Sequence, residues 1–221
     1  MIGNQLITDR NRFTVQTAAL IAMFAVRVSY ELVGQVIYVI ATYALSYIFF
    51  LTVPTEERHV YNLCRPNRKT IVMVVFVALL ATVLNIVVWH FWFGLAFEEI
   101  GNIAVFMVIS PFVLIMMITV QFLLNALPEE FLFRGFFWGY SRKSKSSEVS
   151  ILCIQTILFW GAHYYYFSKP GPWIMVLLMG LIFGAVAWKT KSLFLSALVH
   201  ACVNSTSLFF VFPHTGFWFG E

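Results

Sequence analysis

The amino-acid sequence predicts an all-α protein, a polytopic transmembrane helical bundle with about seven spans. Of its 221 residues, 61% are hydrophobic and only 11% are charged, whereas about 25% of residues are charged in an ordinary soluble domain. The hydrophobic residues form long runs, and about 20 such residues are enough to cross a bilayer as a helix. So few charges could not cover a soluble surface, and we therefore expect an integral membrane protein surrounded by lipids.

The first apolar stretch, residues 13–53, is long enough for two spans that meet near residues 29–34, or for one long tilted helix. No small-residue cleavage site follows the basic residues at its start, so we expect an uncleaved first span. Five further apolar runs complete the predicted bundle: residues 70–93, 103–140, 150–167, 173–188 and 193–212.

Lysine and arginine are concentrated in three short segments between these runs, residues 54–69, 141–148 and 189–191, and an acidic segment lies at 97–102. With the predicted spans, the basic segments fall on one side of the membrane, which the positive-inside rule makes cytoplasmic. The modest net charge of +4 does not indicate a nucleic-acid partner. Three widely spaced cysteines without a CxxC pair indicate neither a disulfide framework nor a zinc–thiolate site. We expect a multi-pass protein of the cell membrane.

Three charged residues lie inside the apolar run at 103–140: Glu129, Glu130 and Arg134. A charged side chain at membrane depth costs about 2.5 kcal/mol or more and marks a functional site. On a helix, Glu130 and Arg134 stand one turn apart and can form an ion pair, whereas Glu129 is rotated by about 100°. We therefore expect Glu130 and Arg134 to support the site and Glu129 to be available for chemistry.

Three of the five histidines lie within apolar runs, but His90 stands near the end of its run beside two tryptophans, whereas His163 and His200 each have a patterned neighbour. His163 follows an aromatic residue by one turn, in Phe159-Trp160-Gly161-Ala162-His163, and His200 shares a helix face with Asn204. At about 1.5 Å per residue, these three side chains and Glu129 lie about 13–20 Å from the basic segments that flank their helices. This agreement in depth predicts that the four side chains converge in one buried cavity between helices.

Three motifs on successive predicted helices, Glu-Glu-x-x-x-Arg, Phe-x-x-x-His and His-x-x-x-Asn, resemble those of the CPBP family. This is the CAAX-protease and bacteriocin-processing, or Abi, family of intramembrane endopeptidases. The resemblance extends from Asn125 to Ser205, and its strength is that all three motifs occur in order. It implies a catalytic helical core at residues 101–221. Residues 1–100 carry no such motif, so we expect variable N-terminal transmembrane spans there, within one integral membrane domain overall.

Peptide hydrolysis needs an activated water, an acid for the leaving amine and a stabilised oxyanion. Glu129 is the expected water activator, and His163 can hold or help to activate that water. His200 and Asn204 can donate hydrogen bonds from one helix face, so they are the expected oxyanion hole. Similarity to the CPBP family implies the same roles, with Glu129 as the water activator.

The neighbouring aromatic residues Phe133, Phe159 and Trp160 are expected to shape a groove for an apolar substrate. No cofactor is expected. Glutamate and histidine are good zinc ligands, and a zinc-bound water would serve equally well. However, no HExxH motif is present, and the resemblance favours a metal-independent reaction, so no metal site is assigned.

The resemblance implies a hydrolase like the type II CAAX prenyl proteases, with its active site opening toward the cytoplasm. Its substrates would be prenylated CaaX tails, other lipidated proteins, or membrane-associated precursor and bacteriocin-type peptides. Two other functions are compatible with these residues. One is a non-catalytic immunity or partner-binding membrane protein on the same scaffold, which a functional Glu129→Gln variant would favour. The other is an ion or proton transporter that uses the charged residues as a relay, which pH-driven flux would favour.

Overall fold

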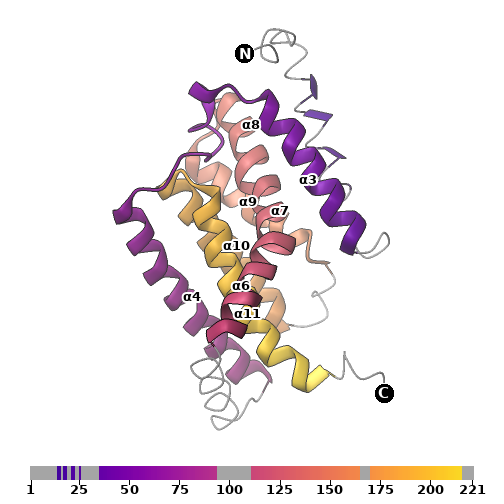
Figure 1. Cartoon of the computed structure of the whole chain (residues 1–221), viewed down its shortest axis with the longest axis vertical. Coiled ribbons are helices and arrows are strands. Elements are labelled where there is room, and N and C mark those ends of the chain that lie inside the picture. The colour runs from indigo at the N-terminus through magenta and orange to yellow at the C-terminus, as the bar shows by residue number, and fades with distance from the viewer. Residues whose placement is uncertain are drawn as a thin grey trace.

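The structure, a computed structural model, describes residues 35–93, 111–164 and 170–215, and seven isolated positions between residues 14 and 25. Its elements in chain order are α3 (Gln35–Thr52), η1 (Thr55–Glu57), α4 (Arg68–Phe93), α6 (Pro111–Gln121), η2 (Phe122–Ala126), α7 (Leu127–Glu130), η3 (Phe131–Phe137), α8 (Trp138–Lys143), α9 (Glu148–Gly161), α10 (Pro170–Thr190) and α11 (Leu193–Thr215). These described residues form helices and turns without a β-strand, so the predicted all-α class is confirmed (Figure 1).

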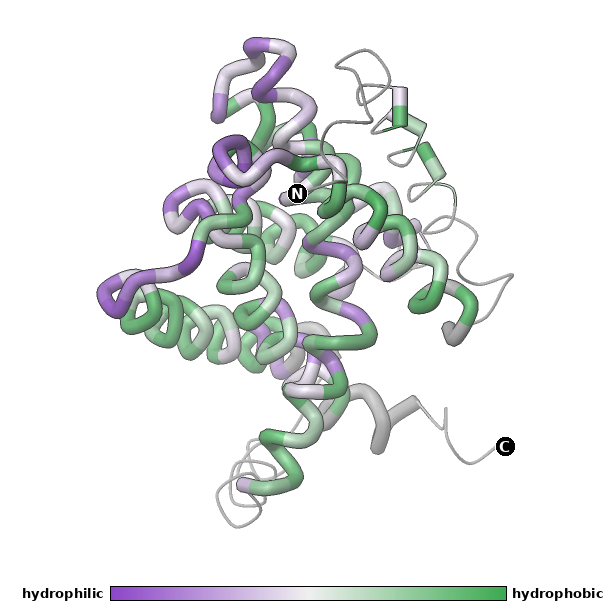
Figure 2. Tube along the Cα trace, turned by 45° about the horizontal axis from the view of Figure 1, so that its top comes forward, coloured by the Kyte–Doolittle hydropathy of each residue, from purple (hydrophilic) through white to green (hydrophobic). Residues whose placement is uncertain are grey.

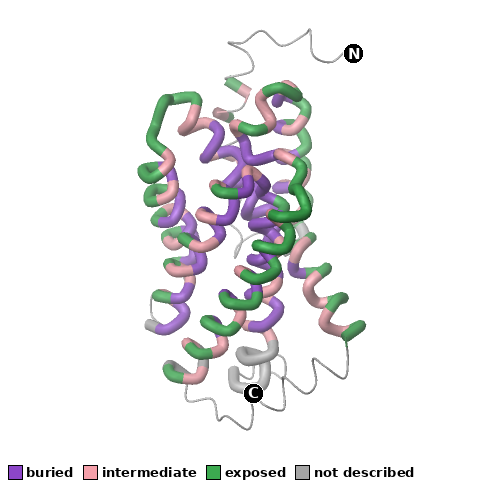
Figure 3. Tube along the Cα trace, turned by 90° about the vertical axis from the view of Figure 1, so that its left-hand side faces the viewer, coloured by how far each residue is buried: buried purple, intermediate pink, exposed green. Residues whose placement is uncertain are grey.

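Helix α11 lies at the centre of the packing. It contacts α4, α6 and α10, and α10 packs in turn against α9. In Figure 1, α4 lies along one flank of the bundle and α3 along the other. Buried residues gather where the helices face one another, and many outward faces are exposed (Figure 3). On α4 the exposed side chains include Val72, Phe76 and Leu79, as expected for a helix in contact with lipid rather than water.

The described helices support an integral membrane protein. Three are long and apolar enough to cross a membrane: Arg68–Val88, Pro111–Lys143 and Gly171–Thr190. Three shorter apolar helices accompany them: Val39–Thr52, Glu148–Gly161 and Leu193–Leu208. The count of about seven spans and the cavity between them stay predictions. The span predicted at 150–167 corresponds to α9, which ends at Gly161.

Several sequence predictions fall outside the described residues. They are the meeting point of the first two spans near 29–34, the acidic segment at 97–102 and the boundary between residues 100 and 101. On either side of that boundary the described helices are in contact, because α4 packs against α10 and α11. The described N-terminal residues are therefore attached to the predicted catalytic core.

The long helix from Pro111 to Lys143 is not α-helical throughout. Two π-helical segments, η2 and η3, flank the short α7 that carries both glutamates. Single π-helical turns within α-helices frequently occur at functional sites. In η2 the carbonyl oxygen of Leu123 accepts a hydrogen bond from the hydroxyl of Tyr43 on α3. The sequence predicts a kink at Pro128. The structure has a π-helical segment before and another after the short helix that contains this residue, and the kink itself stays a prediction.

Helices α9 and α10 approach closely at Gly180 and Gly184. A methyl group at Gly180 would lie 3.0 Å from the ring of Phe159, and one at Gly184 would lie 2.4 Å from the amide nitrogen of Gln155. The four-residue spacing of these glycines predicts close helix packing, and the structure confirms it. The approach brings the aromatic and polar side chains of α9 against α10.

The three basic segments meet at one end of the bundle, where hydrophilic residues gather in the turns (Figure 2). Arg142 donates to the carbonyl oxygen of Val60 at 2.6 Å and to Asn62 Oδ1 at 2.9 Å. It also pairs with Glu148 at 2.6 Å, and Lys191 lies 3.7 Å from the same carboxylate. These contacts join all three segments and confirm that they share one end of the bundle. The assignment of that end to the cytoplasm stays a prediction.

Candidate active site

Three of the predicted site residues meet in the interior of the bundle. Glu129 comes from α7, His163 from the turn after α9 and His200 from α11. Glu129 Oε2 lies 3.8 Å from His163 Nε2 and 3.9 Å from His200 Nε2. All three residues are buried. The convergence that their common depth predicts is therefore present for one carboxylate and two imidazoles.

The partners of the two Nδ1 atoms determine where each ring carries a proton. His163 Nδ1 lies 2.7 Å from the carbonyl oxygen of Phe159, and His200 Nδ1 lies 3.1 Å from Glu130 Oε1. Carbonyl and ionised carboxylate oxygens accept hydrogen bonds and do not donate them, so each Nδ1 donates its N–H. In a neutral ring the Nε2 atom then carries a lone pair. Both Nε2 atoms face Glu129.

Glu130 is fully buried and binds groups from three directions. Its Oε1 pairs with Arg134 Nη1 at 3.0 Å, in addition to its contact with His200. Its Oε2 accepts a hydrogen bond from the Ser196 hydroxyl at 2.7 Å. Arg134 also donates to the carbonyl oxygen of Gly180 at 3.0 Å. The ion pair that the i,i+4 spacing predicts is present, and it belongs to a network that reaches α10 and α11.

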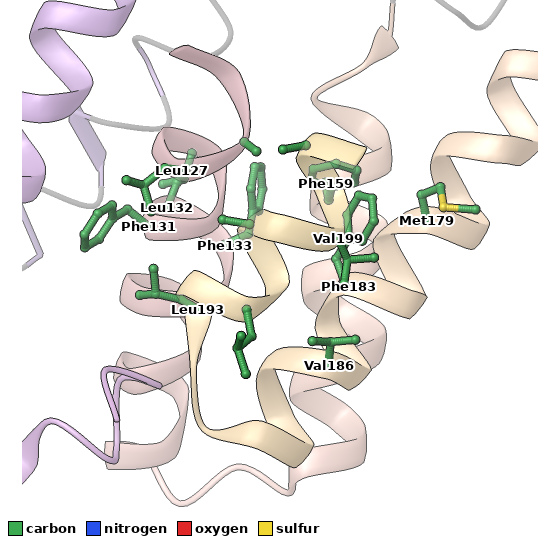
Figure 4. Close-up of a cluster of buried hydrophobic side chains, with 14 of the residues drawn as sticks. Leu127, Phe131, Leu132, Phe133, Phe159, Met179, Phe183, Val186, Leu193 and Val199 are labelled. Atoms are coloured by element: carbon green, nitrogen blue, oxygen red, sulfur yellow. The ribbon is translucent and has the colours of Figure 1, made fainter. Parts of the chain in front are cut away.

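The rings of Phe133, Phe159 and Phe183 lie close together (Figure 4), and the guanidinium of Arg134 lies near all three. The guanidinium of Arg134 lies 4.4 Å from the ring centre of Phe159, within cation–π range. His200 stacks on Phe183 with ring centres 4.4 Å apart, and Phe133 packs edge-on against Phe159. Phe133 and Phe159 are buried, so they form an apolar wall of the site. Their role in a substrate groove stays a prediction.

Asn204 and Trp160 are the remaining predicted site residues, and both are half-buried. Asn204 follows His200 by one turn of α11, as its position in the motif requires. The Trp160 indole donates to the carbonyl oxygen of Trp173 at 3.1 Å and thus links α9 to α10. The roles of Asn204 as an oxyanion donor and of Trp160 as a groove residue stay predictions.

Ser196 is a residue of the site that the sequence interpretation missed. It is fully buried on α11, one turn before His200, just as Asn204 lies one turn after it. Three polar residues at intervals of four therefore follow one face of an apolar helix. A search for this periodicity would have found Ser196, whereas a search for the known motifs does not.

Two further polar residues hold the backbone around the cluster. Gln155 on α9 is fully buried and donates to the carbonyl oxygen of Gly180 at 3.2 Å. Asn62, in the segment between η1 and α4, donates to the carbonyl oxygen of Arg134 at 2.8 Å. Neither contact has a sequence signal, because both depend on how segments far apart in the chain pack together.

The described residues contain no group of three or more histidine, cysteine, aspartate or glutamate side chains placed to hold a metal ion. Glu129 and the two histidines are nevertheless of the ligand types that zinc binds. Their Nδ1 contacts with a carbonyl and a carboxylate are also those of zinc-bound histidines. No metal site is assigned, and chelation is the direct test of metal dependence.

The fold and the site together define a class of protein. The fold is that of an integral membrane protein, and a carboxylate facing two histidines is an arrangement suited to proton transfer in hydrolysis. Residues 111–206 match the family described as Type II CAAX prenyl endopeptidase Rce1-like. The match confirms, for this segment, the resemblance to the CPBP family of membrane proteases. No curated protein and no solved structure matches the chain.

Proposed function

We propose that this chain is an intramembrane endopeptidase in which Glu129 activates a water molecule for attack on a peptide bond. The observation that carries this proposal is the position of Glu129 Oε2, 3.8 Å from His163 Nε2 and 3.9 Å from His200 Nε2. These separations exceed a direct hydrogen bond and suit a bridging water. The family match over residues 111–206 supports peptide hydrolysis.

A water between Glu129 and His163 would donate one proton toward each, because both facing atoms accept hydrogen bonds. Its lone pair is then free to attack the carbonyl carbon of the substrate. As the new C–O bond forms, Glu129 takes a proton from the water and the carbonyl oxygen gains the negative charge. When the tetrahedral intermediate collapses, the C–N bond breaks and Glu129 returns the proton to the leaving amine. The carboxylate ends the cycle as it began.

His200 and Asn204 are the proposed donors to the oxyanion. Asn204 offers the N–H groups of its amide. His200 donates its Nδ1–H to Glu130, so its Nε2 donates only when the ring carries both protons, as an imidazolium ion paired with that carboxylate. The aromatic rings around His200 lower the local dielectric and so strengthen these interactions in the transition state.

The proposed substrate is a membrane-associated peptide, such as a prenylated C-terminal CaaX tail. Glu129 precedes Ser141, at the basic end of the bundle, by 12 residues, which is about 18 Å of helix. A lipidated or apolar peptide reaches this depth sideways through the bilayer, between exposed apolar helix faces. Under the positive-inside rule the site opens toward the cytoplasm from the cell membrane.

Cleavage of a panel of fluorogenic peptides, with and without a prenyl group, tests the proposal on the purified chain in detergent. Glu129→Gln keeps the side-chain shape but cannot take the proton, and we expect its kcat to fall about a thousandfold. The matched control is Glu57→Gln. It changes a partly exposed glutamate that pairs with Lys143, and its activity should stay within about twofold of the wild type. Wild-type cleavage by Glu129→Gln would contradict the proposal.

The same assay decides the dependence on metal. Because a carboxylate serves as the base, we expect a strong chelator to leave the wild-type rate unchanged. Loss of activity on chelation, with recovery on addition of zinc, would replace this mechanism with attack by a zinc-bound water.

A further inference from the structure

We propose that Ser196 is a positioning residue for His200 and that it acts through Glu130. This inference rests on the proposed function, in which His200 Nε2 faces the reacting groups. The Ser196 hydroxyl lies 2.7 Å from Glu130 Oε2, and His200 Nδ1 lies 3.1 Å from Glu130 Oε1. One carboxylate therefore connects the serine to the histidine that follows it by one turn on α11.

The two oxygens of Glu130 have different partners. Oε1 binds His200 and Arg134, and Oε2 binds Ser196. A carboxylate held at one oxygen can still turn about its last torsion, because an sp³–sp² torsion has broad energy minima. The bond from Ser196 to the second oxygen removes this freedom. Oε1 then stays in line with the Nδ1–H of the histidine.

Ser196 also touches the residue that packs against the face of the histidine ring. Its hydroxyl lies 2.8 Å from the carbonyl oxygen of Phe183, and the Phe183 ring stacks on His200. A hydroxyl has one proton to donate, and a carboxylate is a stronger acceptor than a carbonyl. We therefore assign the proton to the bond with Glu130, with the Phe183 carbonyl as the weaker neighbour.

Burial makes these contacts persistent. Ser196, Glu130 and Arg134 are 0% exposed and His200 is 3% exposed, so water does not compete for their hydrogen bonds. In such surroundings each hydrogen bond to a charged group is stronger than it would be in water. Loss of the Ser196 hydroxyl is therefore expected to move the carboxylate and, with it, the proton on the histidine.

The position of the imidazole protons tests this expectation without any substrate. In the chain labelled with ¹⁵N-histidine, we expect His200 to carry a proton on Nδ1, its signal being identified by its absence in His200→Gln. In Ser196→Ala we expect a second signal, from a ring without a proton on Nδ1, which is not the imidazolium ion that donates to the oxyanion. The matched control is Ser205→Ala, which removes another fully buried hydroxyl of α11, one that donates to the Ala201 carbonyl. The control should keep the wild-type signal, and a wild-type signal in Ser196→Ala would overturn the proposal.

Kinetics with a prenylated peptide test whether the ring position matters for catalysis. We expect kcat of Ser196→Ala to fall about tenfold with KM within about twofold, and both constants of Ser205→Ala to stay within about twofold. Ser196→Cys keeps the side-chain volume but is a weak donor, so it should behave as Ser196→Ala does. Wild-type kcat in Ser196→Cys, or equal losses in Ser196→Ala and Ser205→Ala, would overturn the proposal.

This proposal and the proposed function fail in different ways. If Glu129→Gln cleaves peptides at the wild-type rate, the proposed function fails, and the nitrogen signals still test the connection from Ser196 to His200. If Glu129→Gln is inactive while Ser196→Ala keeps the wild-type nitrogen signals, the role of Ser196 alone fails.

Discussion

Arg134 is a fully buried cation, and its partners lie on three sides. Nη1 pairs with Glu130 and Nη2 donates to the Gly180 carbonyl, while the guanidinium lies against the ring of Phe159. A buried ion pair contributes little compared with an apolar pair of the same volume. Removal of one partner is costly, because it leaves an uncompensated charge in the interior.

We therefore expect Arg134→Met to lower the free energy of unfolding by about 3–5 kcal/mol. The matched control is Lys143→Met, which breaks the partly exposed pair with Glu57 and should cost about 0–1 kcal/mol. Unfolding in a denaturing detergent, monitored by circular dichroism, measures the change in the free energy of unfolding for both variants. Equal losses would contradict the difference in burial on which this prediction depends.

The residue-level contacts differ in how far the sequence predicts them. The pair of Glu130 with Arg134 follows from the four-residue spacing on one helix. The contacts of Glu130 with Ser196 and His200 cross 66 and 70 residues and depend on how α11 packs. The four-residue spacing of Ser196, His200 and Asn204 shows that they share a helix face, but it does not show which residue they meet.

At the level of secondary-structure elements, the segment before α4 packs against α8 where the ring of Tyr61 lies close to Gly139. A methyl group at Gly139 would lie 2.0 Å from the Tyr61 ring, and a ring cannot bend away. We expect Gly139→Ala to lower the free energy of unfolding by about 1–3 kcal/mol. At Gly161 an added methyl meets nothing within 4 Å, so Gly161→Ala should be neutral or stabilise by less than about 1 kcal/mol. Detergent unfolding of both variants tests this contrast, and a neutral Gly139→Ala would contradict it.

Glu148, at the start of α9, makes stability depend on pH. Partial burial raises the pKa of this carboxyl, but the hydrogen bonds from Arg142 and Trp138 and the charge of Arg142 outweigh burial, so its pKa is lowered. A carboxyl with a lowered pKa stabilises the fold above its unfolded-state pKa. It loses this contribution as the pH falls through the folded-state pKa.

We therefore expect thermal stability to decline on acidification below the ordinary pKa of glutamate. Glu148→Gln should be less stable than the wild type at neutral pH and should lose less on acidification. Thermal unfolding of both proteins between about pH 7 and pH 3 measures the difference. The same loss in both proteins would show that Glu148 is not responsible.

The helices themselves are largely predictable, and their irregularities are not. Helices α4, α10 and α11 begin at or within a few residues of the spans predicted at 70–93, 173–188 and 193–212, because apolar runs mark them clearly. The π-helical segments η2 and η3 have no comparable signal, since their apolar side chains suit an α-helix equally well. In the sequence, Pro128 is the sign of an irregularity at this point.

For the whole molecule, the shared end of the basic segments leads to a prediction about topology. Asn67 and Lys145 lie in different basic segments, and both are exposed. In a chain whose native cysteines are replaced by serine, we expect Asn67→Cys and Lys145→Cys to react with a membrane-impermeant maleimide from the same side. Under the proposed orientation, labelling requires permeabilised cells. Labelling from opposite sides would contradict the fold, and labelling of both in intact cells would reverse the orientation alone.

The sequence predicts the depth of a residue along the membrane normal better than the position of its helix in the membrane plane. Hydropathy and helical rise place Glu129, His163 and His200 at similar depths, and the structure brings these three together. The lateral order of the helices has no such signal, because apolar residues cover the faces toward lipid and the faces toward neighbouring helices alike. The central place of α11 among α4, α6 and α10 therefore emerges from the packing alone.

That central place has a consequence for the way the protein is made. Glu129 is synthesised 71 residues before His200, since a chain is made from its N-terminus. Under the proposed mechanism, a nascent chain holds its general base before it holds the second imidazole and the Asn204 amide. We therefore expect such a protease to lack activity toward neighbouring membrane peptides until α11 has been synthesised.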